Sequence, residues 1–129
     1  MEMLLTIQNE KIQEKLIERL GYLLDWNEEW INQDLPKKIQ KIYKKRCDFV
    51  HDGVTEGITK EDLIFTDDLL FNLLNNIFRN LDKIPSKGKL IEYSDNYRCE
   101  KHLGLKSKYQ FGKFQYMRKK YYKEDIKNL

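Results

Sequence analysis

An arginine and a histidine that could act on a phosphodiester stand five residues apart in the run 42–53, IYKKRCDFVHDG. The planar guanidinium of Arg46 can hold a phosphate through two hydrogen bonds, and the imidazole of His51 can move protons near neutral pH. The pair could polarise a phosphodiester, let the adjacent 2′-hydroxyl of RNA attack it, and protonate the leaving oxygen. Because these steps need no metal ion, we predict a site without a cofactor.

The same spacing also has a purely structural interpretation. Residues 39, 42, 43, 46, 49 and 50 share one predicted helix face, so Arg46 would lie on an apolar stripe and need a partner such as Asp48. His51 would then stabilise the C-terminal end of the helix, where positive charge is favoured. The spacing alone does not decide between the two interpretations.

The residues around the pair resemble the Arg-x4-His signature of the HEPN superfamily, most closely that of its Apea-like branch. The resemblance covers about residues 3–84 and does not extend to residues 89–129. It implies an α-helical bundle that usually dimerises, with Arg and His of both chains in a shared cleft. The positions that match the signature are Tyr43, Arg46, Phe49, Val50, His51 and Gly53.

Many HEPN domains are metal-independent endoribonucleases of toxin–antitoxin, abortive-infection or CRISPR-linked defence systems, and others only bind RNA or partner proteins. Carried onto this chain, the resemblance makes Arg46 the phosphate contact and His51 the acid–base or orienting group, supported by Tyr43 and Asp48. It implies RNA, a second copy and an antitoxin or larger defence complex as partners. Cys47 stands where catalytic members often have Asn, Asp or His. The alternative is therefore a non-catalytic helical module for dimerisation or partner binding.

His51 could instead bind zinc, and this role is incompatible with proton transfer. Cys47-x3-His51 and Cys99-x2-His102 are two Cys/His pairs, each able to lie on one helical face. Together they would make a Cys2His2 set suited to tetrahedral zinc. A zinc-bound His51 could not carry protons, so the sequence leaves a zinc site as the less favoured alternative to a metal-free one.

The C-terminal part of the chain is a second candidate for RNA contact. Residues 87–129 carry 12 basic and 5 acidic side chains, whereas residues 1–86 carry 12 and 16. Basic side chains could follow a phosphate backbone while interleaved Tyr and Phe rings stack on bases. A segment docked through its aromatic side, with lysines facing water, would show the same pattern. The candidate RNA-binding residues are Lys108, Lys113, Arg118, Lys119 and Lys120.

The elements that must position these residues are mainly helical. We predict an amphipathic helix over 3–24 and a second from Asp34-Leu35-Pro36 to Asp52-Gly53, where proline suits the start and glycine the end. After the connector 53–60, a third helix is predicted to start at Thr66-Asp67-Asp68 and to end at 85–88. A short strand over 90–93 and a basic helix over 113–127 are predicted beyond it. The apolar face of the third helix is predicted to consist of Leu70, Leu73, Leu74, Ile77, Phe78 and Leu81.

Length and composition fit one helical domain. The 129 residues are 40% hydrophobic and 35% charged, with two cysteines, which is too few for a disulfide scaffold. No apolar stretch approaches the roughly 18 residues needed to span a bilayer. We expect no secretory signal, because Glu2 and Glu10 bracket a short apolar patch that lacks a basic segment and a cleavage site. We therefore expect a soluble, cytoplasmic protein. Residues 1–88 are predicted to form the HEPN-like bundle, with 89–129 as a basic, aromatic-rich extension packed on the same domain.

Overall fold

The computed structural model describes residues 1–24 and 34–106, and all regular secondary structure in these two ranges is helical. The predicted mainly α class and the helical bundle are therefore confirmed. The basic helix predicted over 113–127 lies outside the described residues. The helices are α1 (Glu2–Leu5), α2 (Ile12–Leu23), α4 (Leu35–Asp52), α5 (Lys60–Arg79) and α6 (Lys87–His102).

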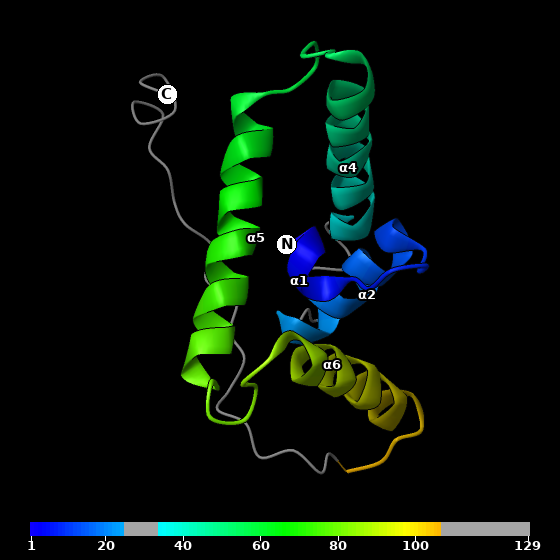
Figure 1. Cartoon of the computed structure of the whole chain (residues 1–129), viewed down its shortest axis with the longest axis vertical. Helices are drawn as coiled ribbons and strands as arrows, with labels where there is room; N and C mark the ends of the chain where they lie inside the picture. Colours follow the sequence, from blue (N-terminus) through cyan, green and yellow to red (C-terminus); the bar gives the residue numbers. More distant parts are fainter. Residues whose placement is uncertain (25–33, 107–129) are drawn as a thin grey trace.

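Two long helices stand apart from each other and are joined at one end by the connector 53–59. These are α4 and α5, and α1 and α2 lie at the base of the space between them (Figure 1). The last helix, α6, crosses the opposite end of the molecule. In this arrangement α2 contacts all of the other described helices, α1, α4, α5 and α6, so it is the element around which the bundle is built.

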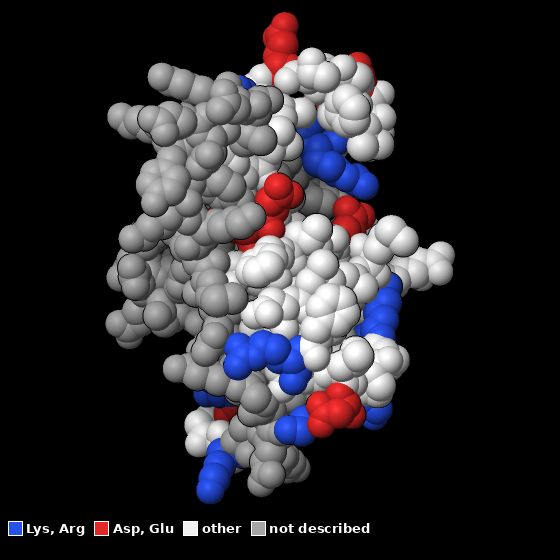
Figure 2. Space-filling model, turned by 90° about the vertical axis from the view of Figure 1, so that its left-hand side faces the viewer, with Lys and Arg blue, Asp and Glu red and all other residues white. Residues whose placement is uncertain are grey.

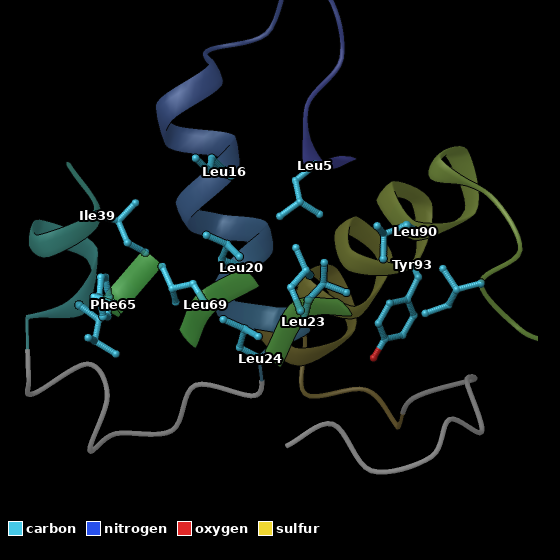
Figure 3. Close-up of a cluster of buried hydrophobic side chains, with 13 residues drawn as sticks. Leu5, Leu16, Leu20, Leu23, Leu24, Ile39, Phe65, Leu69, Leu90 and Tyr93 are labelled. Carbon is cyan, nitrogen blue, oxygen red and sulfur yellow. The ribbon is translucent and has the colours of Figure 1, made fainter. Parts of the chain in front are cut away.

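The core is a leucine cluster centred on α2 (Figure 3). Leu20 and Leu23 are fully buried, and α1, α4, α5 and α6 each contribute at least one buried apolar side chain to the same cluster. Burying a side chain of this size contributes about 1.5–3 kcal/mol, so this cluster is the main source of stability. The other labelled members are Leu5, Leu16, Leu24, Ile39, Phe65, Leu69, Leu90 and Tyr93.

The helix predicted over 3–24 is wrong as one continuous element, because the chain turns between α1 and α2. Asn9 adopts a left-handed conformation (φ 68°), which breaks the helical path. Glu10 follows and turns back, accepting hydrogen bonds from the backbone N–H of Ile7 (3.1 Å) and from Arg19 (2.8 and 2.9 Å). The spacing of seven residues from Leu5 to Ile12 fits one continuous helix, but the Glu10 carboxylate is needed as the partner of a buried guanidinium.

The bounds predicted for the second helix are confirmed by α4. Pro36 lies in its first turn, and Gly53 ends it with φ 67° while its N–H bonds to the carbonyl of Phe49 at 2.9 Å. Asp34 occupies the N-cap position, but its side chain caps no backbone N–H and instead pairs with Lys37 at 3.4 Å. The first half of α4 packs on α2, and the second half extends away from the core with α5.

The predicted start of the third helix at Thr66-Asp67-Asp68 is wrong, because α5 begins two turns earlier at Lys60. Thr59 forms a capping box with Asp62: its hydroxyl accepts from the Asp62 N–H (3.1 Å), and Asp62 accepts from the Thr59 N–H (3.0 Å). Thr66 lies inside the helix and donates to the carbonyl of Asp62 at 2.8 Å. The helix also ends earlier than predicted, at Arg79.

The strand predicted at 90–93 is wrong, because these residues belong to α6. Ser86, predicted to end a helix, starts one by accepting a hydrogen bond from the N–H of Lys89 at 3.3 Å. Leu90 and Tyr93 are buried at helical spacing, with the ring of Tyr97 stacked on that of Tyr93 at 5.8 Å. Across residues 1–24 and 34–106, no helix has the length and apolar character that a membrane span requires.

The buried side of α5 differs from the apolar face predicted for it. Phe65, Leu69 and Leu73 do face the core, but Phe78 and Leu81 are exposed by 66% and 51%. Between the buried apolar residues runs a polar row with a residue every fourth position, so that all its members lie on one helix face. The row consists of Asp68, Asn72, Asn76 and Asn80, each at most 5% exposed.

Candidate functional site

Arg46 lies in the second half of α4, with half of its side chain exposed. Its guanidinium faces Glu2 of α1 at 3.5 Å and lies 5.9 Å from the ring centroid of Tyr43, one turn earlier on the same helix. The ion pair is long and solvent-exposed, and such pairs contribute about 0–1 kcal/mol. Arg46 is therefore held in place by weak contacts and can accept a stronger anionic partner.

A cavity of about 340 Å³ lies beside Arg46, between α4, α5, α2 and the first residues of the chain. Its walls are mostly apolar, and the polar residues that line it are Glu2, Tyr43, Lys45, Arg46, Asp62 and Thr66. The volume falls at the lower end of the range of about 300–1,000 Å³ typical of small-molecule sites. The main apolar walls are Leu20, Ile39, Ile42, Phe49, Leu63 and Leu69.

Two rim groups have pKa values displaced from their usual range. Burial raises the pKa of Tyr43, and the neighbouring Glu2 charge acts in the same direction. Tyr43 therefore keeps its hydroxyl proton at neutral pH. Burial alone would raise the pKa of Asp62, but hydrogen bonds from Lys45 and from Thr59 outweigh it and lower that pKa. The ionised Asp62 thus ties α5 to α4 through Lys45 at the cavity rim.

His51 is exposed in the last turn of α4, as predicted, but it lies on a different side of the helix from Arg46. Five residues of α-helix correspond to a rotation of about 140°, so the two side chains leave α4 in diverging directions. Asp48 lies on the same outer side as His51. The exposed edge that includes His51 also carries, at helical spacing toward the N-terminus, Lys37, Lys41 and Lys44.

The four residues of the alternative zinc site do not lie together in the structure. Cys47 is half-buried on α4, whereas Cys99 is exposed on α6. The Nε2 atom of His102 lies 3.2 Å from the hydroxyl oxygen of Tyr22, on α2. Within residues 1–24 and 34–106 no three His, Cys, Asp or Glu side chains lie close enough to hold a metal ion together.

The basic residues predicted to contact RNA in the C-terminal part lie outside the described residues. This applies to Lys108, Lys113, Arg118, Lys119 and Lys120. The geometry of the candidate site therefore rests on α4 and on the cavity beside it.

The structure also contains a charged centre that the sequence analysis missed. Arg19 of α2 is 1% exposed and donates to Glu10, to Asp95 of α6 (3.1 Å twice) and to the carbonyl of Leu5. Burial acts to lower the pKa of Arg19, but the two carboxylates raise it above its usual value. The hydrogen bond from Arg19 in turn lowers the pKa of Glu10. The sequence does contain one sign of this buried charge, because Arg19 stands among the regularly spaced leucines at positions 16, 20 and 23.

Comparison of the chain with protein-family models, with curated proteins and with solved structures finds no match. The HEPN resemblance stays a prediction that rests on the motif residues.

Proposed function

We propose that the protein binds single-stranded RNA through α4 and carries a candidate metal-independent endoribonuclease site at Arg46 and His51. In this proposal it acts as a homodimer in a prokaryotic or phage defence or toxin setting, with an antitoxin or larger complex as a further partner. The observation that carries the proposal is the position of Arg46, a weakly paired guanidinium at the mouth of an apolar cavity.

A phosphodiester can displace Glu2 from Arg46. The guanidinium can give a phosphate two parallel charge-assisted hydrogen bonds, which are roughly twice as strong as neutral ones. The existing Arg46–Glu2 contact, at 3.5 Å, has neither that geometry nor that strength. Exchange of one partner for the other therefore favours the phosphate.

The cavity next to Arg46 suits a nucleobase. Single-stranded RNA is commonly bound by splaying a base out and stacking it on an aromatic ring, which is worth about 1–3 kcal/mol per base. Tyr43 and Phe49 line the cavity, and Thr66 supplies a hydroxyl on the α5 side. A phosphate on Arg46 would leave the attached nucleoside within reach of these walls.

The outer edge of α4 can hold the neighbouring phosphates. Lys37, Lys41 and Lys44 are exposed at successive turns and lead toward His51. Each phosphate neutralised by such a side chain releases counterions, so affinity should fall steeply with salt. Because Arg46 and His51 diverge on α4, this arrangement supports RNA binding more directly than cleavage.

Cleavage is tested by incubating labelled single-stranded RNA and tRNA with the protein in excess EDTA. The proposal predicts products with 2′,3′-cyclic phosphate ends, lost in both His51→Ala and Arg46→Ala. His102→Ala, which removes the other histidine of the chain, is the matched control and should cleave like wild type. Cleavage that persists in His51→Ala, or that EDTA abolishes, would contradict the assignment of the site.

A non-catalytic partner-binding module is the second candidate, and a separate observation favours it. The end of α4, the connector and the start of α5 expose five large apolar side chains, each by 38–59%. Exposed apolar clusters of this kind mark protein-binding surfaces. If RNA is neither bound nor cut, this module becomes the leading function. The cluster consists of Phe49, Val50, Val54, Ile58 and Leu63.

A further inference from the structure

The cavity beside Arg46 has an apolar interior and a charged mouth. The side chains that line the interior are at most 6% exposed and come from α2, α4 and α5, where they belong to the core cluster of Figure 3. The charged lining residues all keep part of their side chains in contact with water. A ligand that fits both parts has an apolar body and a charged end. The interior residues are Leu16, Leu20, Ile39 and Leu69.

The interior of the cavity offers few hydrogen-bond partners to a ligand. The hydroxyl of Thr66 already donates to the carbonyl of Asp62 at 2.8 Å. The ammonium group of Lys45 already pairs with the Asp62 carboxylate at 2.5 Å. Because a polar group that is buried without a partner is costly, the inner end of the cavity favours a hydrocarbon chain.

The mouth of the cavity favours a head group with one negative charge. Its two ion pairs, Lys45 with Asp62 and Arg46 with Glu2, balance each other in charge. Arg46 has the longer and more exposed pair, so it is the cation that can change partners. A carboxylate matches its guanidinium through two parallel hydrogen bonds. A head group with two negative charges would be repelled more strongly by Glu2 and Asp62.

The volume of the cavity sets the length of the hydrocarbon chain. A methylene group is about the size of a water molecule, whose share of the liquid volume is about 30 Å³. The cavity of about 340 Å³ therefore holds roughly eleven such groups. A chain of this length buries enough apolar surface to bind without a second polar contact.

We propose that the cavity binds an unbranched carboxylate of about eight to twelve carbons, with its carboxylate on Arg46 and its chain against the leucines of α2 and α5. The inference goes beyond the proposed RNA binding and does not depend on it, although both ligands use Arg46. A carboxylate bound there would exclude a phosphate from the same guanidinium. Binding is measured without RNA, so that failure of this inference and failure of the RNA proposal are separate results.

The exposed apolar surface of α5 lacks this combination of an enclosed interior and a cation. Figure 2 views the molecule from the α5 side and shows a broad area that is neither acidic nor basic. Phe71 and Phe78 of α5 are exposed by 50% and 66%, and neither lines the cavity. An amphiphile that adsorbed to exposed apolar side chains would bind regardless of Arg46. Phe78 therefore supplies a matched position outside the cavity.

The first test is titration calorimetry of the full chain with sodium decanoate. Wild type should bind one decanoate per chain, and Arg46→Gln should bind at least about tenfold more weakly, because the charge-assisted contact is lost. Arg79→Gln is the control and should bind like wild type, since Arg79 lies ten residues, or about 15 Å along α5, beyond Leu69. Absence of binding to wild type, or equal affinities of wild type and Arg46→Gln, would overturn the inference.

The second test varies the two ends of the ligand on the wild-type protein. Decanoate should bind about three- to fourfold more tightly than octanoate for each of its two additional methylene groups. Decyltrimethylammonium has the same chain with a cationic head and should bind at least about tenfold more weakly than decanoate. Equal affinities for octanoate and decanoate, or for decanoate and decyltrimethylammonium, would contradict the inference.

The third test fills the cavity from two of its walls. Ile42→Trp on α4 and Thr66→Phe on α5 place larger side chains in the cavity, and each should weaken decanoate binding at least about tenfold. Phe78→Trp enlarges a side chain outside the cavity and should bind like wild type. Circular dichroism shows which variants keep their helicity. Unchanged decanoate affinity in a folded Ile42→Trp or Thr66→Phe would place the chain elsewhere and overturn the inference.

Discussion

Two arginines of this chain lie on helix stripes that are otherwise largely apolar, and the structure treats them in opposite ways. Arg19, in the body built from α1, α2 and α6, is 1% exposed and is satisfied by Glu10, Asp95 and a backbone carbonyl. Arg46, in the arm built from α4 and α5, is half exposed and has Glu2 at 3.5 Å. Sequence spacing alone does not separate these two situations.

The difference indicates which of the two arginines is available to bind a ligand. A buried guanidinium with several charge-assisted hydrogen bonds is part of the fold, and removing any partner leaves a costly buried charge. A half-exposed guanidinium at the mouth of a cavity contributes little to the fold and can change partners. The body is thus the stable platform, and the arm carries the candidate site.

The largest expected effect is on the free energy of unfolding of Arg19→Met. Removing the guanidinium leaves Glu10 and the Leu5 carbonyl without their shared donor, so we expect a loss of about 3–5 kcal/mol. Arg46→Met, the matched variant on α4, should change stability by no more than about 0.5 kcal/mol. Urea unfolding followed by circular dichroism measures both. Equal losses in the two variants would contradict the contrast between body and arm.

A smaller effect is expected in acid. The pKa of Glu10 is lowered from 4.5 by its hydrogen bond from Arg19, so the unfolded state binds the proton more readily than the folded one. The stabilisation is complete above pH 4.5 and is lost as the pH falls through the lower folded value. Glu10→Gln should cost about 1.5–3 kcal/mol at neutral pH and lose less stability than wild type on acidification. Parallel pH profiles for the two proteins would refute this assignment.

The parts of the fold predictable from sequence are those fixed by local chemistry. Pro36 and Gly53 determine both ends of α4 through their restricted and permissive backbones, and both ends were predicted. The capping box at Thr59 and Asp62 was equally local, but the acidic run at 67–68 was mistaken for the helix start. The break between α1 and α2 depends on Glu10 reaching Arg19, a contact across nine residues that periodicity does not reveal.

The candidate site was predictable in its residues but only partly in its geometry. The motif identified Arg46 and His51, and their divergence follows from a spacing of five residues on one helix. The cavity beside Arg46, in contrast, follows only from how the core spreads α4 and α5. The two faces of α5 were interpreted by hydrophobicity alone, which fails when a row of Asn side chains is buried through hydrogen bonds to backbone carbonyls. The sign of this buried polar row in the sequence is the four-residue spacing of Asn72, Asn76 and Asn80, which places them on one helix face.

The most direct test of the account is the affinity of Arg46→Ala for fluorescently labelled single-stranded RNA, measured by anisotropy in EDTA. RNA with 2′-O-methyl groups removes the internal nucleophile and so separates binding from cleavage. We expect binding to weaken at least about tenfold, the loss of one charge-assisted contact, with an unchanged unfolding midpoint. Arg98→Ala, whose side chain pairs with Glu18 at 2.6 Å on the body, should bind like wild type. Equal affinities of Arg46→Ala and wild type would contradict the central claim that Arg46 is the ligand-binding cation of this chain.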